Sequence, residues 1–157
     1  KGIIGYLPQE LGLYPNLTVQ ESLEYVGILN GMKKDDYKKQ INYYLEKTSL
    51  TEHRNKKNRQ LSGGMKKRLS IACSLALGSR YLIMDEPGAA LDLECKEMIR
   101  RYLKDYVREG GAVLLTSHEM EELAVCSKLY VLSQSNLKEV PLGLTAEELI
   151  KTFRNQQ

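Results

Sequence analysis

Two adjacent carboxylates, Asp85 and Glu86, follow a short apolar run at residues 81–84. In parallel sheets, ligands bind at the carboxyl ends of the strands, so both acids are expected where a site would form. A bend where the chain leaves the sheet would let both face that site. Asp85 suits a magnesium shell, and Glu86 suits the acceptance of a proton from water. A solvated acidic turn ended by Pro87 is the alternative interpretation, because apolar runs followed by acids are common.

A Leu-Ser-Gly-Gly stretch at residues 61–64 could bind a phosphate. Ser62 can cap the helix that follows, while Gly63 and Gly64 leave backbone N–H groups open at its start. The missing side chains let an anion approach closely, and the helix dipole favours negative charge there. A plain capped helix with glycines in its leading loop would look the same, so the stretch alone leaves both interpretations open.

Two further polar residues follow apolar runs. His118 comes after residues 112–115, and its neutral imidazole could donate one hydrogen bond to a phosphate oxygen. Gln9 follows the run at residues 2–7. In isolation, each has an ordinary explanation: an exposed histidine beside a Thr116–Glu119 capping box, and a polar loop glutamine.

The elements that must position these residues alternate between short apolar runs and helical patterns, which predicts a parallel α/β core. Between residues 17 and 77 the pattern is helical, which predicts an all-α insertion. The predicted division is 1–11 and 79–140 for an α/β core, 12–78 for a helical subdomain containing residues 61–64, and 141–157 for a C-terminal helical tail.

Local signals mark several element boundaries. Capping-box spacing at Thr18–Glu21 and Thr145–Glu148 predicts two helix starts. Asp35 is expected to cap another helix, and Glu119 to begin a helix that ends near Val125. Two short apolar runs around residues 133–136 predict a pair of strands joined by a turn.

The composition excludes some classes of protein. A chain of 157 residues with 42% apolar residues can form one ordinary core, and no run approaches the roughly 18 apolar residues that span a bilayer. The net charge of +3 is small and the 23 basic residues are spread along the chain, which argues against a nucleic-acid-binding stripe. The three cysteines lack metal-ligand spacing and are expected to be reduced thiols.

Taken in order, these motifs resemble those of the ATP-binding cassette (ABC) ATPases. Gln9 matches the glutamine loop, residues 61–65 the signature motif, and residues 90–92 the loop that crosses the dimer. Asp85 and Glu86 match the Walker B aspartate and catalytic glutamate, and His118 the switch histidine. The resemblance implies a P-loop NTPase (RecA-like) parallel-sheet core, incomplete at its N-terminus, with an inserted helical subdomain.

The resemblance also implies a function: the nucleotide-binding subunit of an ABC transporter, at the cytoplasmic face of the membrane. Such subunits form head-to-tail dimers, homo- or heteromeric, with two ATP molecules between them, and work with a transmembrane permease and no nucleic acid. By this resemblance, Asp85 and Gln9 would bind Mg²⁺, and Glu86 would polarise the attacking water. His118 would donate to the γ-phosphate, and Asp92 would couple the two sites. The opposite subunit's nucleotide would be bound by Ser62, Gly63 and Gly64.

Residues 5–19 are similar to those of bacterial multidrug and antibiotic exporters (ABC-2-like). The family's phosphate-binding (Walker A) loop ends in Gly-Lys-Ser/Thr, which residues 1–157 do not contain. We therefore expect that loop upstream of Lys1, and no ATPase activity from residues 1–157 alone. Gly88-Ala89 also departs from the family's usual Thr-Ser or Thr-Ala.

Two alternatives stay open at this point. One is a degenerate cassette that binds a partner and hydrolyses nothing. The other is a soluble cassette ATPase acting on DNA or ribosomes, although the segment between Gln9 and Leu61 shows no sustained heptads.

Overall fold

The computed structural model describes residues 4–9, 12–76, 78–89 and 91–154. The predicted domain limits within 1–3, 10–11 and 155–157, and Ala90 of the predicted dimer-crossing loop, lie outside these residues. The chain divides into two compact units, Lys1–Thr116 and Ser117–Gln157, and each is described by itself. The domain limits proposed from the sequence stay a prediction.

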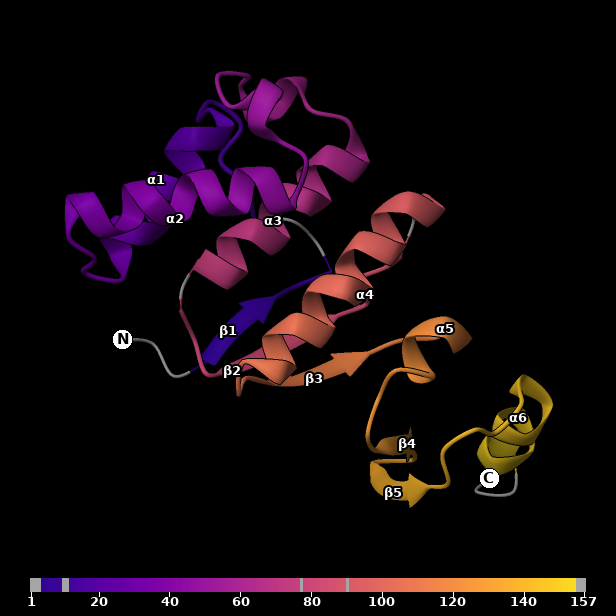
Figure 1. Ribbon diagram of the computed structural model, residues 1–157. Helices are drawn as coiled ribbons and strands as arrows, with labels where there is room; N and C mark the ends of the chain where they lie inside the picture. Colours follow the sequence, from indigo (N-terminus) through magenta and orange to yellow (C-terminus); the bar gives the residue numbers. More distant parts are fainter. Residues whose placement is uncertain (1–3, 10–11, 77, 90, 155–157) are drawn as a thin grey trace. The chain divides into compact units, whose positions relative to one another are not determined.

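A parallel sheet forms the base of the first unit (Figure 1). Within the described residues its strands are β1 (Ile4–Leu7), β2 (Tyr81–Asp85) and β3 (Ala112–Thr116), in the order β1-β2-β3. The predicted parallel α/β core is therefore confirmed. The register pairs Leu7 with Met84 and Asp85 with Thr116, so the carboxyl ends of all these strands meet at one edge.

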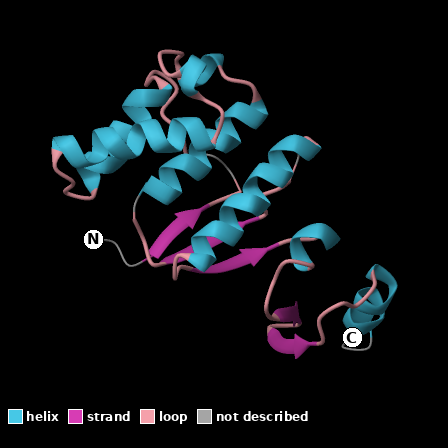
Figure 2. Cartoon of the chain, viewed as in Figure 1, coloured by secondary structure: helices cyan, strands magenta, loops and turns pink. Residues whose placement is uncertain are grey.

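Helices α3 (Gly63–Ala76) and α4 (Leu93–Arg108) lie on the same side of this sheet (Figures 1 and 2). The helices and the sheet share one hydrophobic core, whose buried members from these elements include Leu7, Leu69, Ile71, Leu75, Leu82, Met84, Cys95, Ile99 and Leu103. At Gly5 a Cβ atom would come within 3.0 Å of the Ser74 backbone oxygen, so glycine allows β1 and α3 to approach this closely.

The helical insertion packs α1 (Val19–Leu29) and α2 (Lys34–Lys47) against α3. The capping box predicted for α1 is confirmed: Thr18 Oγ1 accepts from the Glu21 N–H, and Glu21 Oε2 accepts from the Thr18 N–H. The cap predicted at Asp35 is wrong. Lys33 is the N-cap of α2, and Asp35 lies in the first turn, where the helix dipole favours a negative charge.

Two 3-10 turns, η1 (Thr51–His53) and η2 (Asn58–Gln60), connect α2 to α3. Asn58 is buried at this junction, where its amide donates to the Tyr14 carbonyl oxygen and to Ser22 Oγ. These bonds fix the connecting segment against the loop before α1 and against the first turn of α1.

The second unit contains α5 (Met120–Leu123), β4 (Leu129–Ser133), β5 (Asn136–Val140) and α6 (Ala146–Arg154). β4 and β5 are the predicted pair of strands, and they form an antiparallel hairpin whose turn residues Gln134 and Ser135 both have positive φ. The capping box at Thr145 is confirmed. The capping box proposed at Thr116 is wrong, because Thr116 ends β3, and α5 stops at Leu123, short of the predicted Val125.

Two of the predictions made from composition can be checked against the structure. In the described part of the chain, every helix is too short or too polar to cross a membrane. Cys73, Cys95 and Cys126 are free thiols, as expected. Burial raises the pKa of Cys73 to about 12, which keeps its thiol protonated at neutral pH.

Candidate functional site

Glu86 occupies a sharp turn at the end of β2. Its φ of 44° lies in the left-handed region, which residues with a Cβ atom rarely adopt. The Glu86 N–H donates to the Thr116 carbonyl oxygen at 3.1 Å and to Thr116 Oγ1 at 3.2 Å, and Pro87 is buried directly after it. This turn is the bend that the sequence predicted after the strand.

Gln9 and Glu86 come together although they are 77 residues apart in the sequence. The Gln9 Nε2 amide donates a hydrogen bond of 3.0 Å to Glu86 Oε2. Gln9 follows β1, and Glu86 follows the neighbouring strand β2, so parallel pairing brings both to the same sheet edge. A glutamine that the sequence could not distinguish from a loop residue therefore contacts the predicted catalytic carboxylate.

The Asp85 carboxylate is held by a residue of the neighbouring strand β3. Thr116 Oγ1 donates to Asp85 Oδ1 at 2.5 Å, and the two residues are register partners at the ends of β2 and β3. Sequence reasoning missed Thr116 as a site residue and considered it only as part of a possible capping box beside His118. The available signal was its place as the last residue of the strand that pairs with the one ending in Asp85.

If the complete protein hydrolyses ATP, as the sequence resemblance implies, we predict that Thr116→Val lowers its kcat about tenfold. The change removes a hydrogen bond to a charged group and a contact to the Glu86 N–H, and losing about 1.4 kcal/mol of transition-state stabilisation costs that factor. Thr116→Ser keeps the hydroxyl and should retain most of the activity. Steady-state hydrolysis assays compare the two, and equal rates in both variants would contradict a role for the hydroxyl.

Ser62 caps α3, as predicted: its Oγ accepts from the Met65 N–H at 3.3 Å. Gly63 and Gly64 form the first turn of the helix. A Cβ atom added at either glycine would meet nothing within 4 Å among the described residues. Packing within this part of the chain therefore gives no reason for glycine at these positions, and the start of α3 is open to approach from outside.

Asp92 and His118 are two further site residues predicted from the sequence. Asp92 is the N-cap of α4, where its Oδ1 accepts from the Cys95 N–H at 2.8 Å, so capping alone accounts for this aspartate. His118 is exposed and belongs to the second unit. The nucleotide-binding and coupling roles of both stay predictions.

The donor set at this edge fits a magnesium ion bound together with phosphates. The described residues contain no group of three or more His, Cys, Asp or Glu side chains that could enclose a metal by themselves. Mg²⁺ commonly uses one or two carboxylates and completes its shell with phosphate oxygens and water. Asp85, whose carboxylate Thr116 orients, could supply such a ligand.

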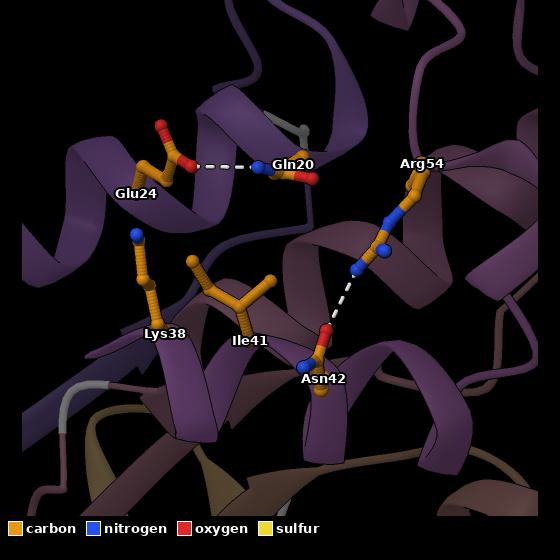
Figure 3. A pocket seen from close by; sticks show the side chains of 6 residues that line it. All are labelled: Gln20, Glu24, Lys38, Ile41, Asn42 and Arg54. Atoms are coloured by element: carbon orange, nitrogen blue, oxygen red, sulfur yellow. Dashed lines mark hydrogen bonds between the residues drawn. The ribbon is translucent and has the colours of Figure 1, made fainter. Parts of the chain in front are cut away.

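A separate pocket of about 190 Å³ lies in the helical insertion (Figure 3). Its polar walls pair with one another: Gln20 Nε2 donates to Glu24 Oε1, and Arg54 Nη2 donates to Asn42 Oδ1, each at 2.7 Å. The Arg54 carbonyl oxygen also accepts from the Gln20 N–H at 3.0 Å. The lining includes none of the predicted site residues, and these bonds fasten the connecting segment to α1 and α2.

Comparison with known proteins identifies the class. The chain belongs to the ABC transporter family, whose sequence model matches residues 1–89. It is 32% identical over 155 residues to an uncharacterized ABC transporter ATP-binding protein of Alkalihalophilus pseudofirmus, covering 98% of this chain and 57% of that protein. It is 36% identical over 135 residues to the linearmycin resistance ATP-binding protein LnrL of Bacillus subtilis, covering 85% of this chain and 43% of that protein. The chain thus spans about half the length of the curated relatives it matches.

Solved structures share the fold. An ATP-binding subunit of an ABC transporter superimposes with a TM-score of 0.86 at 21% identity, covering 97% of this chain and 68% of that one. A dimeric post-hydrolysis state of the ATP-binding cassette MJ0796, bound to ADP and Pi, superimposes with a TM-score of 0.82 at 27% identity. The match covers 92% of this chain and 65% of that one. The fold class predicted from the sequence, the α/β core of a P-loop NTPase, is confirmed.

Proposed function

We propose that this chain is part of the nucleotide-binding subunit of an ABC transporter, which couples ATP hydrolysis to substrate movement by a membrane partner. The observation that carries the proposal is the Gln9–Glu86 hydrogen bond at the carboxyl edge of the parallel sheet, beside the Asp85–Thr116 pair. Family membership supports it.

In this proposal each side chain has a defined task, and Gln9 has two. Glu86 accepts a proton from the attacking water, and Gln9 holds the Glu86 carboxylate in place. Asp85, oriented by Thr116, would hold Mg²⁺ together with Gln9. When bound, Mg²⁺ neutralises charge on the phosphate oxygens. His118 is proposed to donate to the γ-phosphate.

The proposed partners are a second nucleotide-binding subunit and a transmembrane permease, with the protein bound peripherally at the cytoplasmic face. The open first turn at Gly63 and Gly64 supports the first partner, because it leaves room for a nucleotide held by another subunit. The dimeric MJ0796 structure has a related chain in a dimer. Residues 5–19 and the likeness to LnrL favour export of an antibiotic-like substrate.

The test is Mg²⁺-dependent ATP hydrolysis by the complete gene product. Asp85→Asn should reduce turnover by at least about a hundredfold, because the neutral amide is a poor ligand for a hard cation. Asp105→Asn on α4, where the carboxylate pairs with Arg108, is the matched control and should leave turnover unchanged. ATP binding without any turnover in the unmodified protein would favour the degenerate cassette instead.

A further inference from the structure

Lys67 is a buried cation inside the candidate site. It lies in α3, five residues after Ser62, and its residue exposure is 5%. Its Nζ donates a hydrogen bond of 3.2 Å to the backbone carbonyl oxygen of Glu86. Removing an ammonium group from water is costly, so a lysine buried here must be held by polar partners. The Glu86 carbonyl is one of them.

We propose that Lys67 is a positioning residue for Glu86: it holds the Glu86 peptide in its left-handed turn and so fixes the carboxylate beside Gln9. The inference rests on the proposed function, since it assigns a role within that same site. Lys67 acts through the Glu86 backbone, whereas Gln9 acts on the carboxylate itself.

The backbone geometry explains why such a residue is needed. A left-handed φ is unfavourable for a residue with a Cβ atom and persists where the surroundings determine it. The peptide group before Glu86 is held by Thr116, which accepts from the Glu86 N–H. The peptide group after Glu86 is held by Lys67. With both flanking peptides fixed, the side chain points where Gln9 donates to it.

The position of Lys67 also links two parts of the site. Ser62, Gly63 and Gly64 lie at the start of the helix that carries it, and Ser62, five residues before Lys67, is about 7.5 Å away along the axis at ~1.5 Å per residue. The same helix contacts β1, where Ser74 Oγ donates to the Tyr6 carbonyl oxygen, shortly before Gln9. A shift of this helix would therefore move the Lys67 ammonium relative to Glu86. Binding of a nucleotide at Ser62, Gly63 and Gly64 would then change the position of the Glu86 carboxylate in the same subunit.

The test compares three variants of the complete gene product. Lys67→Met keeps a similar apolar stem and removes the ammonium group, Lys67→Arg keeps a cation, and Lys104→Met removes an exposed lysine from α4 as the control. We expect kcat to fall about tenfold in Lys67→Met, the cost of one charge-assisted hydrogen bond, with KM for ATP unchanged. Lys67→Arg should recover part of the loss, and Lys104→Met should match the unmodified protein. A Lys67→Met variant with unchanged kcat, or with only KM raised, would overturn the inference.

A double-mutant cycle separates positioning from a general loss of structure. If the only effect of Lys67 is to position the Glu86 carboxylate by holding its backbone, Lys67→Met should cause little further loss in a Glu86→Gln background under single-turnover conditions. An equal fold-loss in both backgrounds would contradict this role. Should Lys67→Met fail to fold, Lys67→Gln replaces it in the cycle. If the unmodified protein shows no ATP hydrolysis that depends on Glu86, the proposed function itself fails. If the protein does hydrolyse ATP in this way and the Lys67 variants keep the same kcat, only the Lys67 inference fails.

Discussion

Glu86→Gln in the complete protein should reduce ATP hydrolysis by at least about a hundredfold, the usual scale for losing a general base. ATP binding should survive. The structure gives the reason for this separation: the amide introduced at position 86 still offers an oxygen to the Gln9 donor and leaves the Thr116 contacts to the backbone intact. The shape of the site is kept, and what is lost is the group that accepts the proton.

The measurement pairs steady-state hydrolysis with equilibrium ATP binding. Because the substitution blocks turnover but not binding, ATP should also trap a stable dimer visible by size-exclusion chromatography. Glu94→Gln, at the exposed start of α4, removes a carboxylate outside the site and should behave like the unmodified protein. Near-normal turnover in Glu86→Gln would remove Glu86 from its proposed role.

Local signals predicted the elements well where a short-range rule decides the structure. The capping boxes at Thr18 and Thr145 each depend on residues three positions apart, and the sequence shows both partners. The exception is Asp35, which is followed directly by another acidic residue. The N-cap of the helix lies two residues before Asp35. Spacing alone does not decide which residue before a helix becomes the cap.

The contacts within the site could not be predicted from the sequence in the same way. The Gln9–Glu86 and Lys67–Glu86 bonds join residues on different elements, and their geometry depends on strand order and on how α3 packs. Lys67 lies among basic residues that look like a solvated helix face. Its burial follows from the close approach of α3 to the sheet, which a periodicity argument does not contain.

Ser62→Arg should abolish dimerisation and hydrolysis while leaving ATP binding to the monomer nearly unchanged. Ser62 is exposed at the start of α3, in the open region where the added Cβ atoms of Gly63 and Gly64 would meet no described neighbour. A long cation there should therefore fit on the isolated subunit. In a head-to-tail dimer it would occupy the place of the opposite subunit's γ-phosphate.

Ser62→Ala is the matched control, because it removes the cap on the Met65 N–H without adding bulk. Loss of a serine cap costs about 1 kcal/mol of stability, so this variant should unfold at a slightly lower temperature and still dimerise. A defect shared equally by Ser62→Ala and Ser62→Arg would point to the cap, and a defect confined to Ser62→Arg would point to the interface.

Mixing experiments then decide whether Ser62 acts on its own subunit's nucleotide or on the partner's. Combining the Ser62→Arg and Glu86→Gln proteins gives a heterodimer with two different sites. One site carries neither change, because the Ser62→Arg subunit supplies Glu86 to it and the other subunit supplies an intact Ser62. The second site carries both changes. Activity should return on mixing, to at most about half that of the unmodified dimer if the paired sites fire independently. Binding provides the decisive control: if Ser62→Arg abolished ATP binding to the isolated monomer, Ser62 would act in its own subunit, and the head-to-tail arrangement would be wrong for this protein.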